Sequence, residues 1–342
     1  MPITSRASRA PAARSADGML ATNRWKRGLH RLAASRLPWA LLILTWICLL
    51  VRLTVRDAHD WSALFFYIGP WPILLVSWPL LALPAFLNRR GLRLRLGLAG
   101  LGLLVTFAGW KFSPAPPPLA PIPPGSVAGP ARTVLFWNIN HPRQVPAQVH
   151  ELLQRHRPDI LVLAEAEKQS PEDLAAMRVR HPDYHISRLP GGILLAVLGR
   201  AQLQKTIHLP SRTNALWLHC QFTDNPAEHW QLILADLGPW PLLPRTDRTE
   251  AVRQFAGSAP RTLVIGDFNT PYDSTAFDPW RHAWNHGLSQ SPGSPGNATW
   301  PLGLPLLSID HIWMSPDLRP LRAQKGTPGF YDHAWQLITV GL

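Results

Sequence analysis

The chain has 342 residues, and its 34 Lys and Arg against 21 Asp and Glu give a formal net charge of +13, although only 16% of residues are charged and 46% are hydrophobic. Soluble domains carry about 25% charged residues, so this composition indicates a membrane region averaged with a soluble one. Its two cysteines, Cys48 and Cys220, exclude a disulfide framework and the zinc site of a finger.

The basic excess lies in the amino-terminal part of the chain. Residues 1–129 hold 15 Lys and Arg against 3 acidic residues, whereas residues 130–342 hold 19 against 18. A nucleic-acid-binding domain would carry its positive charge on itself. The nearly neutral second part therefore does not have the composition of a domain that grips duplex phosphates.

Residues 1–36 form a basic tail, and three apolar segments follow at 37–55, 61–87 and 92–110. A spanning helix needs about 20 residues, which the second segment has and the outer two reach when their end arginines extend to water. Lys and Arg are concentrated before the first segment and between the last two, so we expect three spans, a cytoplasmic amino terminus and an extracytoplasmic soluble domain in an inner or plasma membrane. Two spans would instead leave that domain in the cytoplasm, and a cleaved signal peptide with core helices is the other alternative.

A proline-rich segment at 112–131 predicts a semi-rigid linker, and residues 132–342 are enough for one large core. Met1 and Met19 are both candidate starts. Short apolar runs predict strands, and apolar residues at helical spacing predict helices, the second of them capped by Ser170. The predicted strands are 133–137, 160–164, 192–198, 216–222, 231–235, 262–265, 311–314 and 334–340, and the predicted helices are 145–155, 171–181 and 246–255.

Polar side chains follow several of these strands. Asn138 and Asn140 end the first, two residues apart, so an extended chain points both to one side. Glu165 directly follows the apolar run Ile160–Ala164, where a carboxylate needs water, a partner or a metal. Turn formation and ordinary solvent exposure are the alternatives for these positions.

The most specific cluster is Gly266-Asp267-Phe268-Asn269, which places a carboxylate and an amide together after a buried strand. Two Asp-His pairs follow, at Asp310-His311 and Asp332-His333. A histidine that is oriented by a carboxylate suits proton transfer or the stabilisation of charge on a phosphate.

Together, and in this order, these motifs resemble the endonuclease/exonuclease/phosphatase superfamily of deoxyribonuclease-I-like hydrolases, in a membrane-anchored bacterial form. The resemblance implies an α/β (α+β) fold, a four-layered sandwich of two packed β-sheets flanked by helices, here preceded by transmembrane helices. It also implies a Mg²⁺-dependent phosphoesterase, with Mn²⁺ as the other candidate ion. By the resemblance, Glu165, Asn138 and Asp332 would lie at the metal, Asp267 would activate water, Asn269 would hold the phosphate, and His333, oriented by Asp310, would stabilise the pentacovalent phosphorus; Asn140, Asp236 and His311 are secondary candidates.

One block departs from the family pattern, because Asp236 stands where the family usually has a histidine. A carboxylate does not donate a hydrogen bond to phosphate unless it is protonated. The site therefore works without that donor, or Asp236 adds a metal ligand, or the chain is a catalytically degenerate membrane-anchored scaffold. The substrate classes left open are nucleic acid, nucleotide and phospholipid headgroup, and no protein partner can be inferred.

Overall fold

The computed structural model describes residues 36–87, 92–111, 130–209, 214–239, 245–294, 296–301, 306–327, 329 and 331–342. Nearly all of the predicted basic tail and most of the predicted linker lie outside these residues. The chain divides into two compact units, one made of residues 1–50 and 71–111 and the other of residues 51–70 and 112–342. The second unit therefore contains a segment that precedes the last two apolar helices in the sequence.

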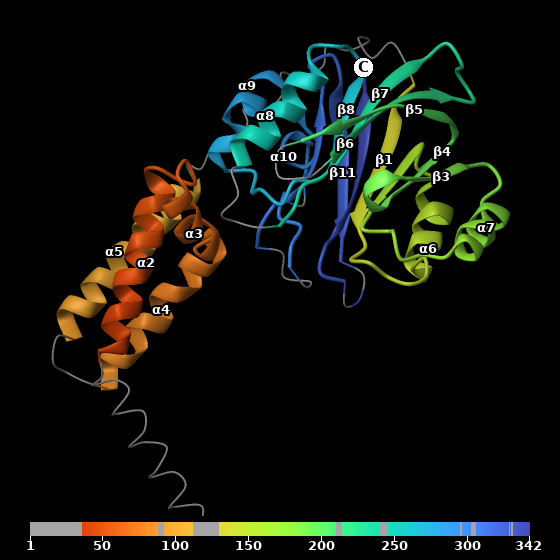
Figure 1. The fold of residues 1–342 in the computed structure, drawn as a ribbon. Helices are drawn as coiled ribbons and strands as arrows, with labels where there is room; N and C mark the ends of the chain where they lie inside the picture. The colour runs from red at the N-terminus through yellow and green to blue at the C-terminus, as the bar shows by residue number, and fades with distance from the viewer. Residues whose placement is uncertain are drawn as a thin grey trace, which may run out of the picture. The chain divides into compact units, whose positions relative to one another are not determined.

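The first unit is built from apolar helices: most of α2 (Leu37–Leu53), α4 (Trp71–Leu87) and α5 (Leu92–Lys111). Helices α4 and α5 run side by side in Figure 1. The Trp78 indole donates a hydrogen bond to Thr106 Oγ1 over 2.7 Å. A Cβ at Gly102 would come within 2.6 Å of the same ring, so glycine is needed for this close approach.

The three predicted spans are not reproduced as three long helices. Among the residues that the structure describes, only α5 is long and apolar enough by itself to cross a membrane, and α2 is shorter, with 17 residues. The predicted helix 61–87 is interrupted: α3 (Asp60–Ile68) ends before Gly69, and α4 begins after Pro70. Proline disfavours helical backbone in the residue before it, which explains the break. If α3 and α4 are counted as one broken span, two candidates result.

The second unit contains two six-stranded mixed sheets. The first has the order β11-β12-β1-β2-β4-β3 and the second the order β5-β6-β7-β8-β10-β9. The strands are β1 (Arg132–Asn138), β2 (Ile160–Ala164), β3 (His185–Leu189), β4 (Ile193–Val197), β5 (Gly199–His208), β6 (Asn214–Phe222), β7 (His229–Asp236), β8 (Thr262–Asp267), β9 (Asn285–His286), β10 (Asp310–Met314), β11 (Arg319–Gly326) and β12 (Trp335–Gly341). The helices are α6 (Ala147–His156), α7 (Pro171–Arg180), α8 (Arg245–Ala256), α9 (Asp278–Ala283) and α10 (Gly287–Gln290), with short 3-10 helices η1 (Pro190–Gly192) and η3 (Thr275–Phe277).

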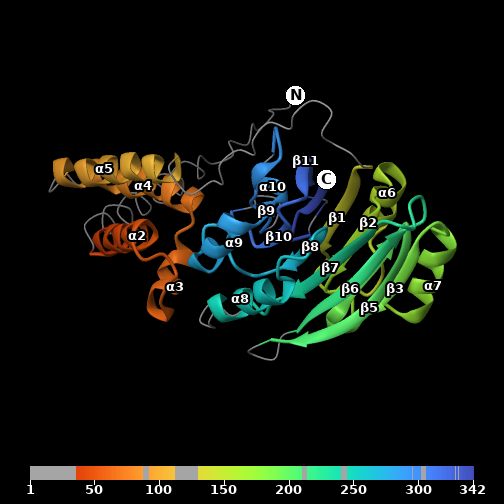
Figure 2. The same ribbon diagram turned by 90° about the horizontal axis from the view of Figure 1, so that it is seen from above.

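The sheets pack face to face, with helices outside them, which confirms the predicted four-layered sandwich. Seen from above, α6 and α7 lie on one side of the strands and α8 on the other (Figure 2). The buried side chains between the sheets come from both, as Phe136 of β1 and Leu234 of β7 illustrate. Ser170 caps α7 as predicted, since its hydroxyl accepts a hydrogen bond from the Asp173 amide over 3.1 Å.

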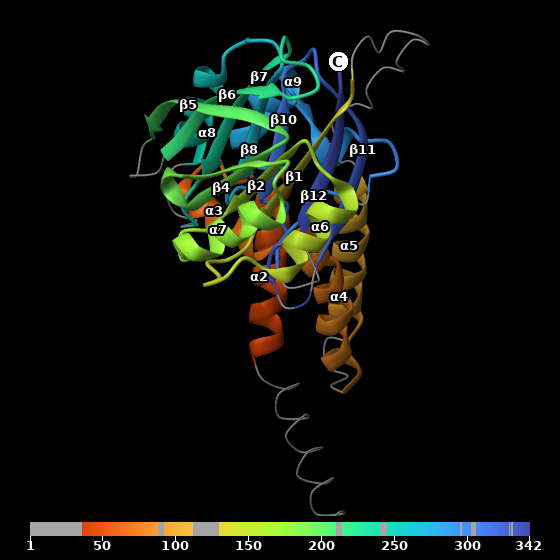
Figure 3. The ribbon, with the colours of Figure 1, turned by 90° about the vertical axis from the view of Figure 1, so that its right-hand side faces the viewer.

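Strand directions bring the polar strand ends together. β1 and β2 are parallel, as are β7 and β8, whereas β12 is antiparallel to β1 and β10 to β8. Figure 3 shows β1 beside β12 and β2, with α6 and α7 in front. At Gly266 a Cβ would lie 1.7 Å from the Ala235 carbonyl oxygen, so only glycine allows β8 to approach β7 this closely.

Candidate active site

Six polar side chains converge at one end of the two sheets. Four strands end there, β10 begins there, and one residue lies just before β12. The side chains are those of Asn138, Glu165, Asp236, Asp267, Asp310 and His333. In the second sheet, Asp267 on β8 lies beside Asp236 on the neighbouring strand β7 and beside Asp310 on the other neighbour, β10. The structure therefore brings six predicted site residues together in one place, with Asp236 among them as a secondary candidate.

Three carboxylates form the first part of the site. Glu165, Asp236 and Asp267 offer oxygens that all lie within 4.8 Å of one another, with Asp267 buried and the other two half-buried. Burial, and next the charge of Glu165, raises the pKa of Asp236 to about 7. Burial and the charge of Asp310 raise the pKa of Asp267 well above its ordinary value. Such a cluster is unfavourable unless protons or a cation neutralise it, and oxygen ligands are those that Mg²⁺ prefers.

Asn138 holds this cluster together. Its side-chain amide donates to Glu165 Oε1 and to Asp267 Oδ2, both over 3.0 Å, and its Oδ1 accepts the Asn140 amide over 3.0 Å. In this arrangement the oxygen that the resemblance assigns to a metal is already engaged by the backbone. Asn138 thus bridges the two sheets and positions two carboxylates, and Asn140 contributes a backbone donor.

The second part of the site is a buried His-Asp pair. His333 Nδ1 donates to Asp310 Oδ2 over 2.9 Å, and its Nε2 lies 3.9 Å from Asp267 Oδ2. Burial lowers the pKa of His333, but the carboxylates of Asp310 and Asp267 outweigh this and raise it to about 10. The imidazole is therefore a cation at neutral pH that is turned toward the carboxylate cluster, and its contact with Asp310 is the one that the resemblance implies.

Asn269 lies on the loop that leaves β8. Its amide N–H donates to Asp267 Oδ1 over 2.7 Å, and its side chain donates to the Leu237 carbonyl over 2.6 Å. Its φ of 49° and the φ of 56° at Glu165 are left-handed values. Left-handed backbone is uncommon outside glycine and is enriched at functional sites. It persists only where the surrounding structure fixes it, so the backbone of Asn269 and of Glu165 is held by its neighbours.

Two further predicted residues, His311 and Asp332, are not among the six converging side chains. His311 is fully buried on the other face of β10, where its Nε2 donates to the Thr270 carbonyl over 2.8 Å and its Nδ1 lies 3.0 Å from His286 Nε2. Successive residues of a strand point to opposite faces, so Asp310 in the site places His311 in the core. Asp332 belongs to neither of the acidic clusters found among the described residues, and within them its buried Oδ1 has no hydrogen-bond partner.

Sequence reasoning missed two residues beside the site. His141 Nε2 lies 3.0 Å from Glu165 Oε2, and its Nδ1 contacts Glu167. Arg245 at the start of α8 donates to the Asn269 carbonyl and, over 3.3 Å, to Thr270 Oγ1. His141 directly follows Asn140, so its position was a usable signal, whereas nothing near Arg245 in the sequence points to the distant loop that it contacts.

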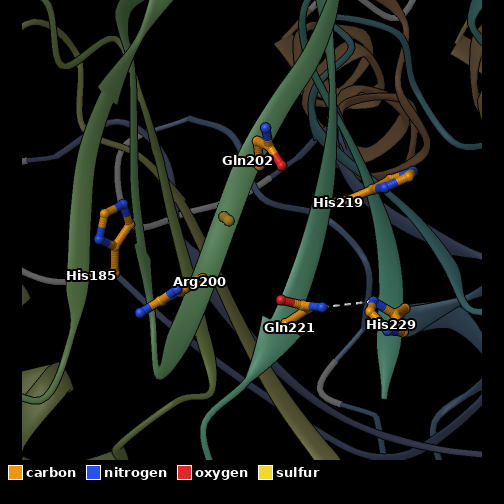
Figure 4. A pocket seen from close by; sticks show the side chains of 7 residues that line it. His185, Arg200, Gln202, His219, Gln221 and His229 are labelled. Carbon is orange, nitrogen blue, oxygen red and sulfur yellow. Dashed lines mark hydrogen bonds between the residues drawn. The ribbon is translucent and has the colours of Figure 1, made fainter. Parts of the chain in front are cut away.

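A separate surface pocket lies at the opposite end of the second sheet. Figure 4 shows polar side chains from β3, β5, β6 and β7 around it, with a 3.1 Å hydrogen bond between Gln221 and His229. His229 begins β7, whereas Asp236 ends it, so the two are about 23 Å apart along the strand. This pocket contains none of the predicted site residues.

The sequence model of the Endonuclease/Exonuclease/phosphatase family matches residues 135–330, more than half of the chain. The chain belongs to the endonuclease/exonuclease/phosphatase family. The matched range covers every strand from β2 to β11. Members of this family are hydrolases that act on phosphoester bonds, and the family match supports a phosphoesterase-like or nuclease-like function for this chain.

Several solved structures are similar to this chain over about three fifths of its length. A family protein from Bacteroides thetaiotaomicron is 15% identical, with a TM-score of 0.47 over 62% of this chain and 98% of the other. A 3'-5' exonuclease from Neisseria meningitidis is 18% identical, with a TM-score of 0.45 over 60% of this chain and 98% of that one. A Neisseria 3' phosphatase bound to a product DNA hairpin is 19% identical, with a TM-score of 0.43 over 61% and 98%. No match was found among the curated proteins.

Proposed function

We propose that the protein is a membrane-anchored, Mg²⁺-dependent phosphodiesterase that cleaves its substrate by attack of an activated water. The observation that carries this proposal is the convergence of three carboxylates with an oriented cationic histidine at one end of the sheets. The carboxylates supply a place for a divalent cation, and the histidine supplies positive charge for the phosphate. A scaffold without turnover is the competing function, favoured by Asp236 in the position of the family histidine.

The carboxylates of Glu165 and Asp236 would hold the ion, with Asp267 beside them. The position of Asp236 next to Glu165 and Asp267 fits the role of an additional metal ligand. Mn²⁺ accepts the same donors. When bound, such an ion polarises phosphoryl oxygens and lowers the pKa of water.

Asp267 faces both the ion-binding carboxylates and His333, so it is placed to orient and deprotonate the attacking water. His333 would act as a cation that stabilises negative charge developing on the phosphate, because its high pKa keeps its proton in place near neutral pH. Asn269 would hold the phosphate, and Asp310 is a positioning residue for His333.

Membrane anchoring has its own support. All but two of the exposed large hydrophobic side chains among the described residues lie between Leu37 and Trp110, and the exceptions are Val179 and Leu203. Apolar helices with apolar exposed faces suit lipid better than water. We infer three crossings, by α2, α4 and α5, with the catalytic unit on the extracytoplasmic side.

The side of the membrane can be argued from contacts within the second unit. The Asp57 carboxylate accepts the Thr275 amide over 2.8 Å, so the loop after α2 and the catalytic sheets belong to one folded body. They must then lie on the same side of the membrane. An even number of crossings separates this loop from the catalytic unit, namely those of α4 and α5, which agrees with the charge-based topology.

The test uses the full chain in lipid nanodiscs, because residues 51–70 are part of the catalytic unit. Hydrolysis of an activated phosphodiester, single-stranded DNA and a phospholipid panel is measured with Mg²⁺, with Mn²⁺ and with a chelator. We expect metal-dependent turnover of at least one substrate, and a loss of about 100-fold or more in kcat on Asp267→Asn and on His333→Ala. His185→Ala, an exposed histidine outside the site, is the matched control.

Two results would contradict the proposal. Absence of metal-dependent turnover on every substrate favours the scaffold. Turnover that survives both site substitutions places the chemistry elsewhere in the chain.

A further inference from the structure

We propose that α3 lies along the membrane surface, with lipid against one face and the catalytic unit against the other, and that it thereby holds the loop after Asp267 in place. The proposal rests on the membrane anchoring argued above, and it is independent of hydrolysis. Three sets of contacts and one exposed surface carry it.

The first set fixes the loop before α3 to η3. Asp57 accepts hydrogen bonds from Ser274 Oγ over 2.5 Å, from the Thr275 amide over 2.8 Å and from Thr275 Oγ1 over 3.0 Å. A carboxylate that accepts three donors at the start of a helical turn is a strong local anchor. These partners lie seven and eight positions after the active-site residue Asp267 in the sequence.

The second set consists of two arginines. Arg52 donates to the Phe66 and Gly69 carbonyls, both over 2.8 Å, and forms an ion pair with Asp273. Arg56 pairs with Asp278, with one of its two hydrogen bonds at 2.9 Å. Arg52 thus ties the end of α2 to the carboxyl end of α3 and to the loop after β8, rather than extending to solvent from a spanning helix.

The third set reaches the active site. The Arg245 guanidinium lies 5.0 Å from the centre of the Tyr67 ring on α3. The same guanidinium donates to the Asn269 carbonyl and to Thr270 Oγ1. One residue therefore links α3 to the loop that carries Asn269, and a cation over an aromatic face adds roughly 1 kcal/mol to such a contact.

The opposite face of α3 is apolar and uncovered. Trp61, Leu64 and Ile68 are 60%, 47% and 45% exposed, at positions i, i+3 and i+7 of one helical face. Ser62, Ala63 and Phe66 are buried on the other side. This division is that of an amphipathic helix between a folded domain and an apolar medium.

Lipid is the occupant that the chain itself indicates. Residues 51–70 are joined at both ends to apolar helices whose exposed side chains are also large and hydrophobic, such as Leu50 and Ile73. The nine residues of α3 are about 14 Å long, too short to cross the roughly 30 Å of hydrocarbon. A short helix tethered between membrane helices, with a tryptophan on its apolar face, fits the interface between headgroups and acyl chains.

The experiment measures membrane depth directly. The full chain, with Cys48→Ala and Cys220→Ala, carries a nitroxide label on one cysteine introduced by Leu64→Cys, Ile68→Cys, Leu104→Cys or Val179→Cys, and is reconstituted in phosphatidylcholine–phosphatidylglycerol vesicles. Collisions of the label with oxygen, which enters lipid, and with a nickel chelate, which stays in water, give its depth. Leu104 on α5 is 66% exposed and Val179 on α7 is 82% exposed, so they serve as the lipid and water references.

We expect labels at 64 and 68 to lie about 5–10 Å below the headgroups, between the two references. A label at 104 in lipid with labels at 64 and 68 in water would overturn the proposal. Labels at 64 and 68 that are shielded from both reagents would overturn it too, because a second protein copy would then cover the stripe. A label at 104 in water would remove the membrane anchoring as well, whereas loss of hydrolysis with unchanged depths would count against the proposed function alone.

Discussion

At the scale of single residues, Asp236 decides how this site differs from the family pattern. It ends β7 beside β8, and its carboxylate lies within 4.8 Å of ligand atoms on Glu165 and Asp267. A histidine in its place would supply a hydrogen-bond donor, whereas the aspartate supplies negative charge. We propose that the exchange moves one element of the site from phosphate binding to cation binding.

We predict that Asp236→Asn weakens Mn²⁺ binding by about 10-fold or more, because one anionic oxygen is lost from the cluster. Titration of the full chain with Mn²⁺, followed by electron paramagnetic resonance of the free ion, measures this without any substrate. Asp183→Asn is the control, since that side chain is 64% exposed and lies outside the site. Equal affinities of the Asp236 variant and the parent would remove Asp236 from the metal site.

A second residue-scale prediction concerns His311. Burial lowers its pKa to about 4, well below the ordinary value of about 6.5, so the folded chain binds fewer protons than the unfolded chain in this range. The contribution of neutral, buried His311 to the unfolding free energy is complete above pH 6.5. It is lost as the pH falls toward 4, by up to about 1.4 kcal/mol for each pH unit. His311 by itself should therefore lower the melting temperature as the pH falls from 7 to 5, whereas Asp236, whose pKa is raised to about 7, acts in the opposite direction.

His311→Gln tests this, because glutamine keeps a donor for the Thr270 carbonyl but does not titrate. We expect its melting temperature to fall less between pH 7 and pH 5 than that of the parent. His185→Gln, at an exposed position, should leave the pH dependence unchanged. An identical acid response in the His311 variant and the parent would show that other groups control it.

At the scale of secondary-structure elements, sequence patterns predicted the inner strands and missed the edges. All four strands absent from the prediction are sheet edges, namely β3 and β11 in one sheet and β5 and β9 in the other. The inner strand β2 is buried throughout and reads as an apolar run, so its predicted bounds agree with the structure. By contrast, most of β5 is exposed, and β11 begins with Arg319-Pro320. Edge strands have too little buried surface to leave a hydrophobic pattern.

The site residues, like the strands, could be predicted where a buried apolar strand marked their position. Residues at the ends of buried strands, such as Glu165 and Asp267, could be located from sequence, because parallel strand ends gather at one edge. Arg245 could not, since its role depends on contacts with Asn269 that no local pattern encodes. The break at Gly69–Pro70 was missed because the apolar composition continues through it, although the proline was a signal.

A prediction at this scale distinguishes the effect of the hydrogen bonds of Asp57 on stability from the effect of its negative charge. Asp57→Ala leaves the Thr275 amide and two hydroxyls without their acceptor, and should cost about 1–3 kcal/mol in the unfolding free energy of the second unit. It should also speed amide hydrogen exchange in residues 273–278. Asp60→Ala removes the same charge three positions along at an exposed site, and should change the unfolding free energy by less than about 0.5 kcal/mol. Equal effects of the two substitutions would mean that the anchor contributes nothing beyond charge.

At the scale of the whole molecule, charge and exposed apolar surface divide at the same place in the sequence. A net charge of +12 belongs to residues 1–129 and +1 to residues 130–342. The exposed large hydrophobic side chains are concentrated in the same first part. We propose that the positive charge serves membrane topology rather than substrate binding, because residues 130–342 have a net charge of only +1 to offer a phosphodiester.

The topology yields the last prediction. Because Asp57 and its loop fold onto the catalytic unit, both must be reachable from one side of the membrane, and the basic segment 88–91 from the other. In spheroplasts, a membrane-impermeant maleimide should label Ala58→Cys and Val179→Cys at once, and Gly91→Cys only after permeabilisation, all in a background of Cys48→Ala and Cys220→Ala. Labelling of position 58 without position 179 would separate the loop from the catalytic unit and remove the argument for two further crossings. Labelling of position 91 alone would place the catalytic unit in the cytoplasm and reverse the charge-based orientation.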